Sequence, residues 1–296
     1  MTFMEEEAIT QPQCWELAAA LSASVAAALP QRGERVAALG CGSSLYMAQA
    51  YAVLREGAGA GQTDAFAASE FPAARKYDRV VAISRTGTTT ELTDAVLALS
   101  GTRRVAITTA PGTPLTRAVD DVVLIDFADE QSVVQTRSAT SALTLLRAHL
   151  GYEVATSVAD ARRALEWQVP AELVDAQEFT FLGRGWTCGI ANEAALKLRE
   201  AVGAWTEAYP AMEYRHGPIS ITEPGRVTWM FGELPAGLAG DIAVTGGTLV
   251  NDAFDPLADL IRVHKLAVAI AARKGLDPDR PRNLTRSVIL EPTPHG

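Results

Sequence analysis

The chain has 296 residues, of which 48% are hydrophobic and 21% are charged, and this balance excludes a disordered chain. Its length predicts either one large domain or two medium ones. The net charge of −9 argues against a nucleic-acid partner, because contacts with phosphates need clustered lysines and arginines.

The first half of the chain alternates predicted strands and helices after an N-terminal helical segment, residues 1–30, whose helix spans Met4–Leu29 and ends at Pro30. Short apolar runs lead into turns rich in glycine or hydroxyl residues, and helical stretches follow. This order predicts a parallel sheet with helices on both faces. The predicted strands are Arg35–Leu39, Val80–Ile83, Arg104–Ile107 and Asp121–Ile125, and the helices run to Arg55, to Leu99 and over Thr140–Leu150.

The second half repeats this plan after a segment rich in alanine and charged residues, 155–177, predicted to be a linker helix with a hinge near Pro170. The stretches VAALGCGSSLYMAQA and FTFLGRGWTCGIANE both read as strand, turn and helix. We therefore expect two similar domains, 31–155 and 156–296, the second ending in a C-terminal tail. The second-half predictions are strands at Phe179–Leu182, Val227–Phe231 and Ile242–Val244, and helices at Ile190–Val202 and Leu257–Arg273.

No pattern in the chain predicts a metal site or a disulfide framework. The three cysteines are an odd number without ligand spacing, and the four histidines are scattered. The N-terminus lacks a basic, apolar leader, and no apolar run reaches the ~18 residues of a membrane span. We therefore expect a reduced, cytoplasmic protein without a metal and without a membrane partner.

Two predicted turns lie where open α/β sheets bind ligands. In the first, Gly40–Ser44, backbone N–H groups at a helix start can hold an anion, and the alternative is a tight turn with Ser44 as N-cap. A dinucleotide site is disfavoured, because Leu45 stands where G-x-G-x-x-G needs its third glycine. The second turn, residues 84–91 (SRTGTTTE), places five hydroxyl side chains around Gly87. One would suffice for an N-cap, so this turn predicts a phosphate cradle.

Two further stretches carry candidate catalytic side chains. Glu193, Lys197 and Glu200 share one face of a predicted helix. Their spacing alone favours a solvated ladder of salt bridges, whereas a carboxylate beside a lysine in a cleft would make a general base. His216 is followed by Gly-Pro, which places it in a turn, where histidine is more often a surface residue than a catalyst.

Taken together and in order, these stretches resemble the sugar isomerase (SIS) family. They are most similar to the isomerase half of glucosamine-6-phosphate synthase and to stand-alone amino-sugar-phosphate isomerases, deaminases and deglycases. The resemblance covers nearly the whole chain, from EAITQP (7–12) through SVVQTRSAT (132–140) to DPDRPRNLTRSVILE (277–291). It implies an α/β fold of two doubly wound SIS domains, each a parallel sheet flanked by helices, with no cofactor.

The resemblance also implies residue roles at a sugar-phosphate site. Glu200 matches the base that moves a proton between carbons 1 and 2, and Lys197 matches its helper. His216 matches the acid/base that opens the sugar ring, and it comes from the neighbouring subunit, which implies a homodimer. The implied binding residues are Gly42, Ser43, Ser84, Thr86 and Thr89 for the phosphate, with Ser44, Arg85, Val133, Gln135 and Arg286 around the sugar.

The chain departs from the synthase pattern in three ways. It begins with the SIS portion, so we do not expect it to release ammonia from glutamine. Arg286 stands where the synthase has a lysine, and arginine cannot form an imine, although it could clamp an anion. The second half has no hydroxyl-rich turn, since its counterpart lies near Trp229–Glu233, so we expect one sugar-phosphate site per chain.

We therefore expect an enzyme that acts on an amino-sugar 6-phosphate, by isomerisation with deamination to a ketose phosphate. Plain aldose–ketose isomerisation and deglycation of a fructosamine phosphate share the same proton transfer and stay open as alternatives. None of these reactions needs a redox cofactor. The rival from another class is a non-catalytic sugar-phosphate sensor, against which the presence of Glu200, Lys197 and His216 argues.

Overall fold

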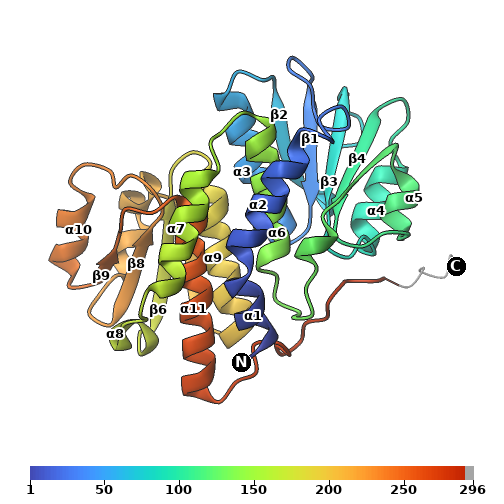
Figure 1. The fold of residues 1–296 in the computed structure, drawn as a ribbon. Helices are drawn as coiled ribbons and strands as arrows, with labels where there is room; N and C mark the ends of the chain where they lie inside the picture. The colour runs from blue at the N-terminus through green and yellow to red at the C-terminus, as the bar shows by residue number, and fades with distance from the viewer. Residues whose placement is uncertain (291–296) are drawn as a thin grey trace, which may run out of the picture.

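The computed structural model describes residues 1–290, which form two parallel β-sheets with helices between them and on their outer faces (Figure 1). The α/β class predicted from the sequence is therefore confirmed. The end of the predicted second domain, 291–296, lies outside the described residues. The first sheet has the order β2-β1-β3-β4-β5, with β1 (Val36–Gly40), β2 (Thr63–Ala67), β3 (Arg79–Ile83), β4 (Arg103–Thr108) and β5 (Asp121–Leu124).

The second sheet repeats the order of the first, with its first strand again between the second and the third. It reads β7-β6-β8-β9, and every strand pair is parallel. In such sheets the chain leaves the first and third strands toward opposite faces, which opens a crevice at their carboxyl ends. The strands are β6 (Glu178–Gly183), β7 (Trp205–Pro210), β8 (Arg226–Met230) and β9 (Thr248–Val250).

The layer between the sheets contains the longest helices of the chain, which come from both halves (Figure 1). Shorter helices cover the outer faces. The central helices are α2 (Gln11–Ser22), α3 (Ser43–Gly57), α6 (Arg137–His149), α7 (Ala155–Glu166), α9 (Thr187–Val202) and α11 (Pro256–Lys274); the others include α1 (Phe3–Ile9), α4 (Thr90–Leu97), α5 (Pro114–Ala118), α8 (Ala171–Val174) and α10 (Leu238–Thr245).

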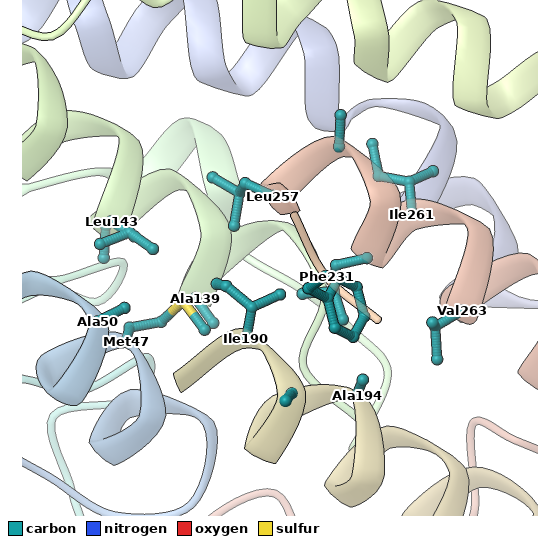
Figure 2. Close-up of a cluster of buried hydrophobic side chains, with 14 of the residues drawn as sticks. Met47, Ala50, Ala139, Leu143, Ile190, Ala194, Phe231, Leu257, Ile261 and Val263 are labelled. Carbon is teal, nitrogen blue, oxygen red and sulfur yellow. The ribbon is translucent and has the colours of Figure 1, made fainter. Parts of the chain in front are cut away.

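One hydrophobic cluster joins the two halves through these central helices. Figure 2 shows Met47 of α3 and Leu143 of α6 beside Ile190 of α9 and Leu257 of α11. All four side chains are fully buried. This cluster also includes residues of α1 and α2, so one continuous core spans the predicted domain boundaries at residues 30 and 155. Those boundaries stay predictions.

The predicted strand at Ile242–Val244 is wrong, because these residues belong to α10. Leu238 and Ile242 are fully buried and stand four residues apart, whereas Val244 is 90% exposed. One buried stripe at helical spacing therefore explains the apolar run. Glycines in the left-handed region at positions 237 and 246 bound the helix, and β9 follows it.

Two other segments differ from their predicted form. The N-terminal helix is split at Thr10 into α1 and α2, because Pro12 has no N–H with which to continue the ladder. The predicted linker helix exists as α7, with Pro170 directly before α8. However, α7 packs against α2 and α11, so it is part of the central layer.

The close crossing of α3 and α9 positions the candidate site. A Cβ atom on Gly189 would lie 2.5 Å from the carbonyl oxygen of Tyr46 and 2.9 Å from the amide nitrogen of Ala50. Only glycine allows two helices to approach so closely. Side chains of the second half therefore reach the turn that follows β1.

Within residues 1–290, no helix is both long and apolar enough to cross a bilayer. The same part of the chain contains no group of three or more His, Cys, Asp or Glu side chains arranged to bind a metal ion.

Candidate active site

The turn after β1 is built by two glycines. A Cβ atom on Gly40 would lie 2.5 Å from the carbonyl carbon of Ser44, and Gly42 has φ +55°, in the left-handed region. The helix α3 begins at Ser43 with Gly42 as its N-cap, so the alternative of Ser44 as N-cap is wrong. The backbone N–H groups at this helix start point out of the carboxyl edge of the sheet, where an anion can bind.

The turn after β3 concentrates hydroxyl groups at the neighbouring strand end. The Ser84 hydroxyl accepts a hydrogen bond from the Gly87 N–H (3.0 Å) and thereby closes the turn. Gly87 has φ +61°, and its Cβ would lie 2.2 Å from the Thr113 hydroxyl oxygen, so no other residue fits there. The Thr88 hydroxyl donates to that of Thr86 (3.0 Å).

The C-terminal segment lies on this hydroxyl cluster, after crossing from α11 to the side of the first sheet (Figure 1). The hydroxyls of Thr86 and Thr88 donate to the Ser287 hydroxyl oxygen at 3.2 and 2.9 Å, and that of Thr89 is 3.5 Å away. The Thr90 N–H, at the start of α4, donates to the Val288 carbonyl (3.2 Å). An anion bound by these hydroxyls must therefore share them with Ser287 or displace it.

On the other side of the turn after β1, α9 presents a buried lysine. The Lys197 ammonium group is 0% exposed and donates to the Glu200 carboxylate (2.6 Å) and the Ser43 hydroxyl (2.9 Å), with Glu193 at 3.4 Å. The solvated ladder that the spacing favoured is therefore wrong. A buried ammonium is stable only where carboxylates and hydroxyls compensate its charge.

Burial and charge shift these groups in predictable directions. Burial by itself lowers the pKa of the Lys197 ammonium, but the carboxylates of Glu193 and Glu200 outweigh burial and raise it. Burial raises the pKa of Glu193 to about 7. Lys197 thus stays protonated, and Glu200, whose side chain is 21% exposed, faces solvent beside a fixed positive charge.

A cavity of about 180 Å³ unites these parts. Its wall includes Glu200 and Ser43, Thr89 of the hydroxyl turn, and the segment Leu284–Val288. A smaller hollow of about 30 Å³ adjoins it and is lined by Ser44, Ser84 and Thr86, among others. The predicted residues Gly42, Arg85, Val133, Gln135 and Arg286 also line the larger cavity.

Arg85 is buried, and its observed contacts are structural. Its guanidinium donates to the carbonyls of Ser132 (2.8 Å), Val133 (3.0 Å) and Arg286 (3.0 Å), and it lies 3.4 Å from the Glu130 carboxylate. It therefore ties the turn after β3 to the loop 130–138 and to the C-terminal segment.

Two carboxylates that the sequence analysis did not single out hold the loop 130–138 in place. The Glu130 carboxylate accepts from the backbone N–H groups of Thr136 (2.6 Å) and Ser138 (3.2 Å). Glu7 accepts from the N–H groups of the two residues after Glu130, and burial raises its pKa to about 7. Glu7 is the first residue of the motif EAITQP, and Glu130 lies two residues before the motif SVVQTRSAT. No spacing rule identifies either carboxylate.

His216 lies outside the cavity, whereas Arg286 lines it. His216 ends a single turn of 3-10 helix, Glu213–His216, and is exposed. It lines neither cavity described above, so the structure does not bring it to Glu200 within one chain. The guanidinium of Arg286 forms an ion pair with Asp129 (2.8 Å), while its backbone carbonyl binds Arg85.

No protein-family model matches the chain, but a comparison with curated proteins finds relatives. The glutamine–fructose-6-phosphate aminotransferase (isomerizing) of Pyrobaculum aerophilum is 32% identical over 267 residues, which cover 73% of this chain and 44% of the relative. The protein of the same name from Gloeobacter violaceus is 28% identical, covering 87% and 52%. The chain thus spans about half the length of these relatives.

Solved structures share the fold over nearly the whole chain. Glucosamine-6-phosphate deaminase from Thermotoga maritima has a TM-score of 0.75 and 23% identity, covering 97% of this chain and 100% of its own. The C-terminal domain of glucosamine-fructose-6-phosphate aminotransferase from Francisella tularensis has a TM-score of 0.81 and 20% identity, covering 95% and 98%. Tagatose-6-phosphate ketose/aldose isomerase from Escherichia coli has a TM-score of 0.78 and 17% identity, covering 98% and 97%.

Proposed function

Because this chain belongs to the sugar isomerase (SIS) family, we propose that it is an enzyme that acts on an amino-sugar 6-phosphate. The reaction is a proton transfer between carbons 1 and 2, followed by loss of ammonia. The observation that carries this proposal is Glu200, which accepts a hydrogen bond from the buried Lys197 and lies in the wall of a cavity that also includes Thr89 of the hydroxyl turn.

The two halves of the cavity suit the two ends of such a substrate. The N–H groups at the start of α3 bind the phosphate together with hydroxyls of the turn after β3, from which the phosphate displaces Ser287. Glu200, across the turn after β1, then acts on the carbons at the other end of the sugar. The Lys197 ammonium does not face the cavity, so it serves as a positioning residue that orients the Glu200 carboxylate.

The chemistry proceeds without net oxidation. In the open-chain form of a 2-amino aldose, Glu200 removes the proton from carbon 2 and returns it to carbon 1. The nitrogen is then part of an imine at carbon 2. One water adds, ammonia leaves, and a ketose 6-phosphate remains. Solved structures of a glucosamine-6-phosphate deaminase and of a ketose/aldose isomerase both have this fold, so the fold is compatible with either reaction.

We assign ring opening to a histidine, and within residues 1–290 no histidine of the same chain lines the cavity. We propose that His216 completes the cavity of a second subunit in a homodimer. In a mixture of Glu200→Gln and His216→Asn chains, each mixed dimer has one intact site. Subunit exchange would then restore about a quarter of the wild-type activity, whereas each variant alone is inactive. No recovery, or an active monomer in sedimentation, would remove His216 from the site.

The decisive assay is release of ammonia from glucosamine 6-phosphate and, separately, from galactosamine 6-phosphate. Ammonia together with a ketose 6-phosphate would establish the deaminase and identify the sugar. Interconversion of an aldose and a ketose phosphate without ammonia would indicate a plain isomerase. Binding of the sugar phosphate without any turnover would favour the non-catalytic sensor and overturn the proposal.

A further inference from the structure

Helix α1 holds a loop that forms part of the wall of the 180 Å³ cavity. The Glu7 carboxylate, on α1, is 3% exposed and accepts hydrogen bonds from the backbone N–H groups of Gln131 and Ser132. The same loop contributes Val133 and Gln135 to the cavity wall. Glu7 itself does not line this cavity, so any effect that it has on a bound sugar passes through the loop.

The N-terminal end of α1 is anchored to the segment that follows α11. The N–H groups of Phe3 and Met4 donate to the two carboxylate oxygens of Asp279 at 2.7 and 2.8 Å. Figure 1 shows this segment passing α1 on its way to the first sheet, where residues 284–288 line the cavity. Helix α1 therefore has a fixed place relative to the cavity, and Glu7 offers the loop a rigid support.

Other parts of the site are held without Glu7. The Glu130 carboxylate fixes the far end of the loop through backbone N–H groups near the start of α6. The Arg85 side chain reaches the loop from the turn after β3, but the Arg85 carbonyl accepts hydrogen bonds from the hydroxyls of Thr108 and Thr109 at 3.0 and 2.9 Å. The turn of the proposed phosphate site thus keeps its anchors at the end of β4 when Glu7 is removed.

We propose that Glu7 positions the wall of the cavity that a bound sugar contacts, by holding the loop at Gln131 and Ser132. It is a positioning residue, because it acts only through this loop. The inference rests on the proposed function, since it takes this cavity as the place where the sugar binds. Without the Glu7 carboxylate, two backbone N–H groups lose their acceptor. An unpaired N–H group inside a protein is costly, so the loop is expected to shift until both find other acceptors.

A neutral side chain at position 7 can give the same support. Burial, together with the nearby Glu130, raises the pKa of Glu7 to about 7. One oxygen, Oε1, accepts both hydrogen bonds, and Oε2 accepts none from residues 1–290. Glu7→Gln places a carbonyl oxygen where Oε1 lies and is the conservative variant, whereas Glu7→Ala removes the acceptor.

The test compares a hexosamine 6-phosphate with inorganic phosphate, and calorimetry measures the binding of each. The sugar phosphate is glucosamine 6-phosphate or galactosamine 6-phosphate, whichever the wild type binds. Glu7→Ala is expected to weaken binding of the sugar phosphate about tenfold and to leave that of inorganic phosphate within about twofold. Glu7→Gln is expected to bind the sugar phosphate within about threefold of the wild type.

The matched control is Glu6→Ala, at an exposed position of the same helix, and it should bind both ligands as the wild type does. Unchanged binding of both ligands by Glu7→Ala would overturn the inference. An equal loss for both would also overturn it, because it indicates general damage to the fold, and so would Glu7→Gln binding as weakly as Glu7→Ala. If circular dichroism shows that Glu7→Ala is unfolded, Glu7→Asp takes its place with the same expected result, because its carboxylate is one methylene group shorter.

Kinetics separate this inference from the proposed function. In an active enzyme, Glu7→Ala should raise KM about tenfold and leave kcat within about twofold, because Lys197 and Glu200 lie on α9 and not on the loop. If ammonia is released and Glu7→Ala keeps the wild-type KM, the proposed function stands and the inference is overturned. If the wild type binds a hexosamine 6-phosphate without turnover and Glu7→Ala loses only that binding, the proposed function fails and the inference stands. No binding of any hexosamine 6-phosphate by the wild type would overturn both.

Discussion

The turn after β1 and the turn after β6 share glycines at two matching positions and differ in their other side chains. A Cβ atom on Gly40 or on Gly183 would lie 2.5 or 2.3 Å from the backbone four residues later. Two residues on, Gly42 and Gly185 have φ +55° and +59°. Each turn starts a central helix, so both halves offer a helix N-terminus at the carboxyl edge of a sheet.

Only the first turn continues into hydroxyl groups that face a cavity. The second continues into Trp186 and Thr187, and the Thr187 hydroxyl donates to the Phe231 carbonyl (3.0 Å). Its hydrogen-bonding capacity is thus used within the fold. The turn after β8 has no counterpart of the hydroxyl cluster at residues 84–90. A shared backbone plan therefore does not make a binding site; the side chains that follow it do.

The second half contributes to the site through a helix and not through its turn. Lys197 and Glu200 of α9 reach the first turn, because Gly189 lets α9 cross α3 closely. In the proposed function, one half binds the phosphate and the other supplies the base. This division agrees with the expectation of one sugar-phosphate site per chain, which stays a prediction.

The sharpest way to break this division is Glu200→Gln. Turnover is expected to fall about 10²- to 10⁴-fold, because the amide cannot accept a proton, while the affinity for the sugar phosphate changes little. Ammonia release and calorimetry measure the two quantities. Glu172→Gln, at an exposed position of α8, is the control and should retain full turnover. Normal turnover by Glu200→Gln would refute the assignment of the base.

The equivalence of the two turns is tested by Gly40→Ala and Gly183→Ala. Each added methyl group meets backbone atoms that cannot move away, so each variant should lose about 3 kcal/mol of its free energy of unfolding. Urea denaturation measures this loss. If one variant is as stable as the wild type while the other is not, the two turns are not equivalent.

The difference between the hydroxyl cluster after β3 and the turn after β6 is tested by Thr86→Val and Thr187→Val. Thr86→Val removes a hydroxyl from the proposed phosphate site and should weaken binding of glucosamine 6-phosphate about tenfold. Thr187→Val removes a hydrogen bond inside the second half and should cost about 1 kcal/mol of stability without changing that affinity. Equal affinities for all three proteins would show that the phosphate binds elsewhere.

The smallest expected effect concerns pH and the buried Glu178 of β6. Burial raises its pKa to about 7, above the ordinary 4.5 of an unfolded chain. Protonated Glu178 therefore stabilises the folded chain fully below pH 4.5, and this stabilisation is lost as the pH rises through 7. Relative to Glu178→Gln, the wild type should lose on the order of 1 kcal/mol between pH 5 and pH 8. Parallel denaturation curves of both proteins across this range would contradict the shift.

Local sequence signals predicted the elements that border the site. The strands before both glycine turns and the helices after them lie where they were expected, within a few residues. The strand predicted at Ile242–Val244 was wrong because the apolar run there is short. A run of that length fits a strand and one buried stripe of a helix equally well. Glu7 and Glu130 had no local signal, because each acts on backbone groups that the fold brings to it.

The sequence by itself determined which side chains share a turn or a helix face. Glycine positions specify the turns, and the 3.6-residue period places Glu193, Lys197 and Glu200 together. Whether that face is solvated or buried was decided only by the packing of α9 on α3. The docking of Ser287 on the threonine hydroxyls was decided only by the path of the C-terminal segment. The physical reason is that periodicity is a property of neighbouring residues, whereas burial and charge compensation depend on segments far away in the chain.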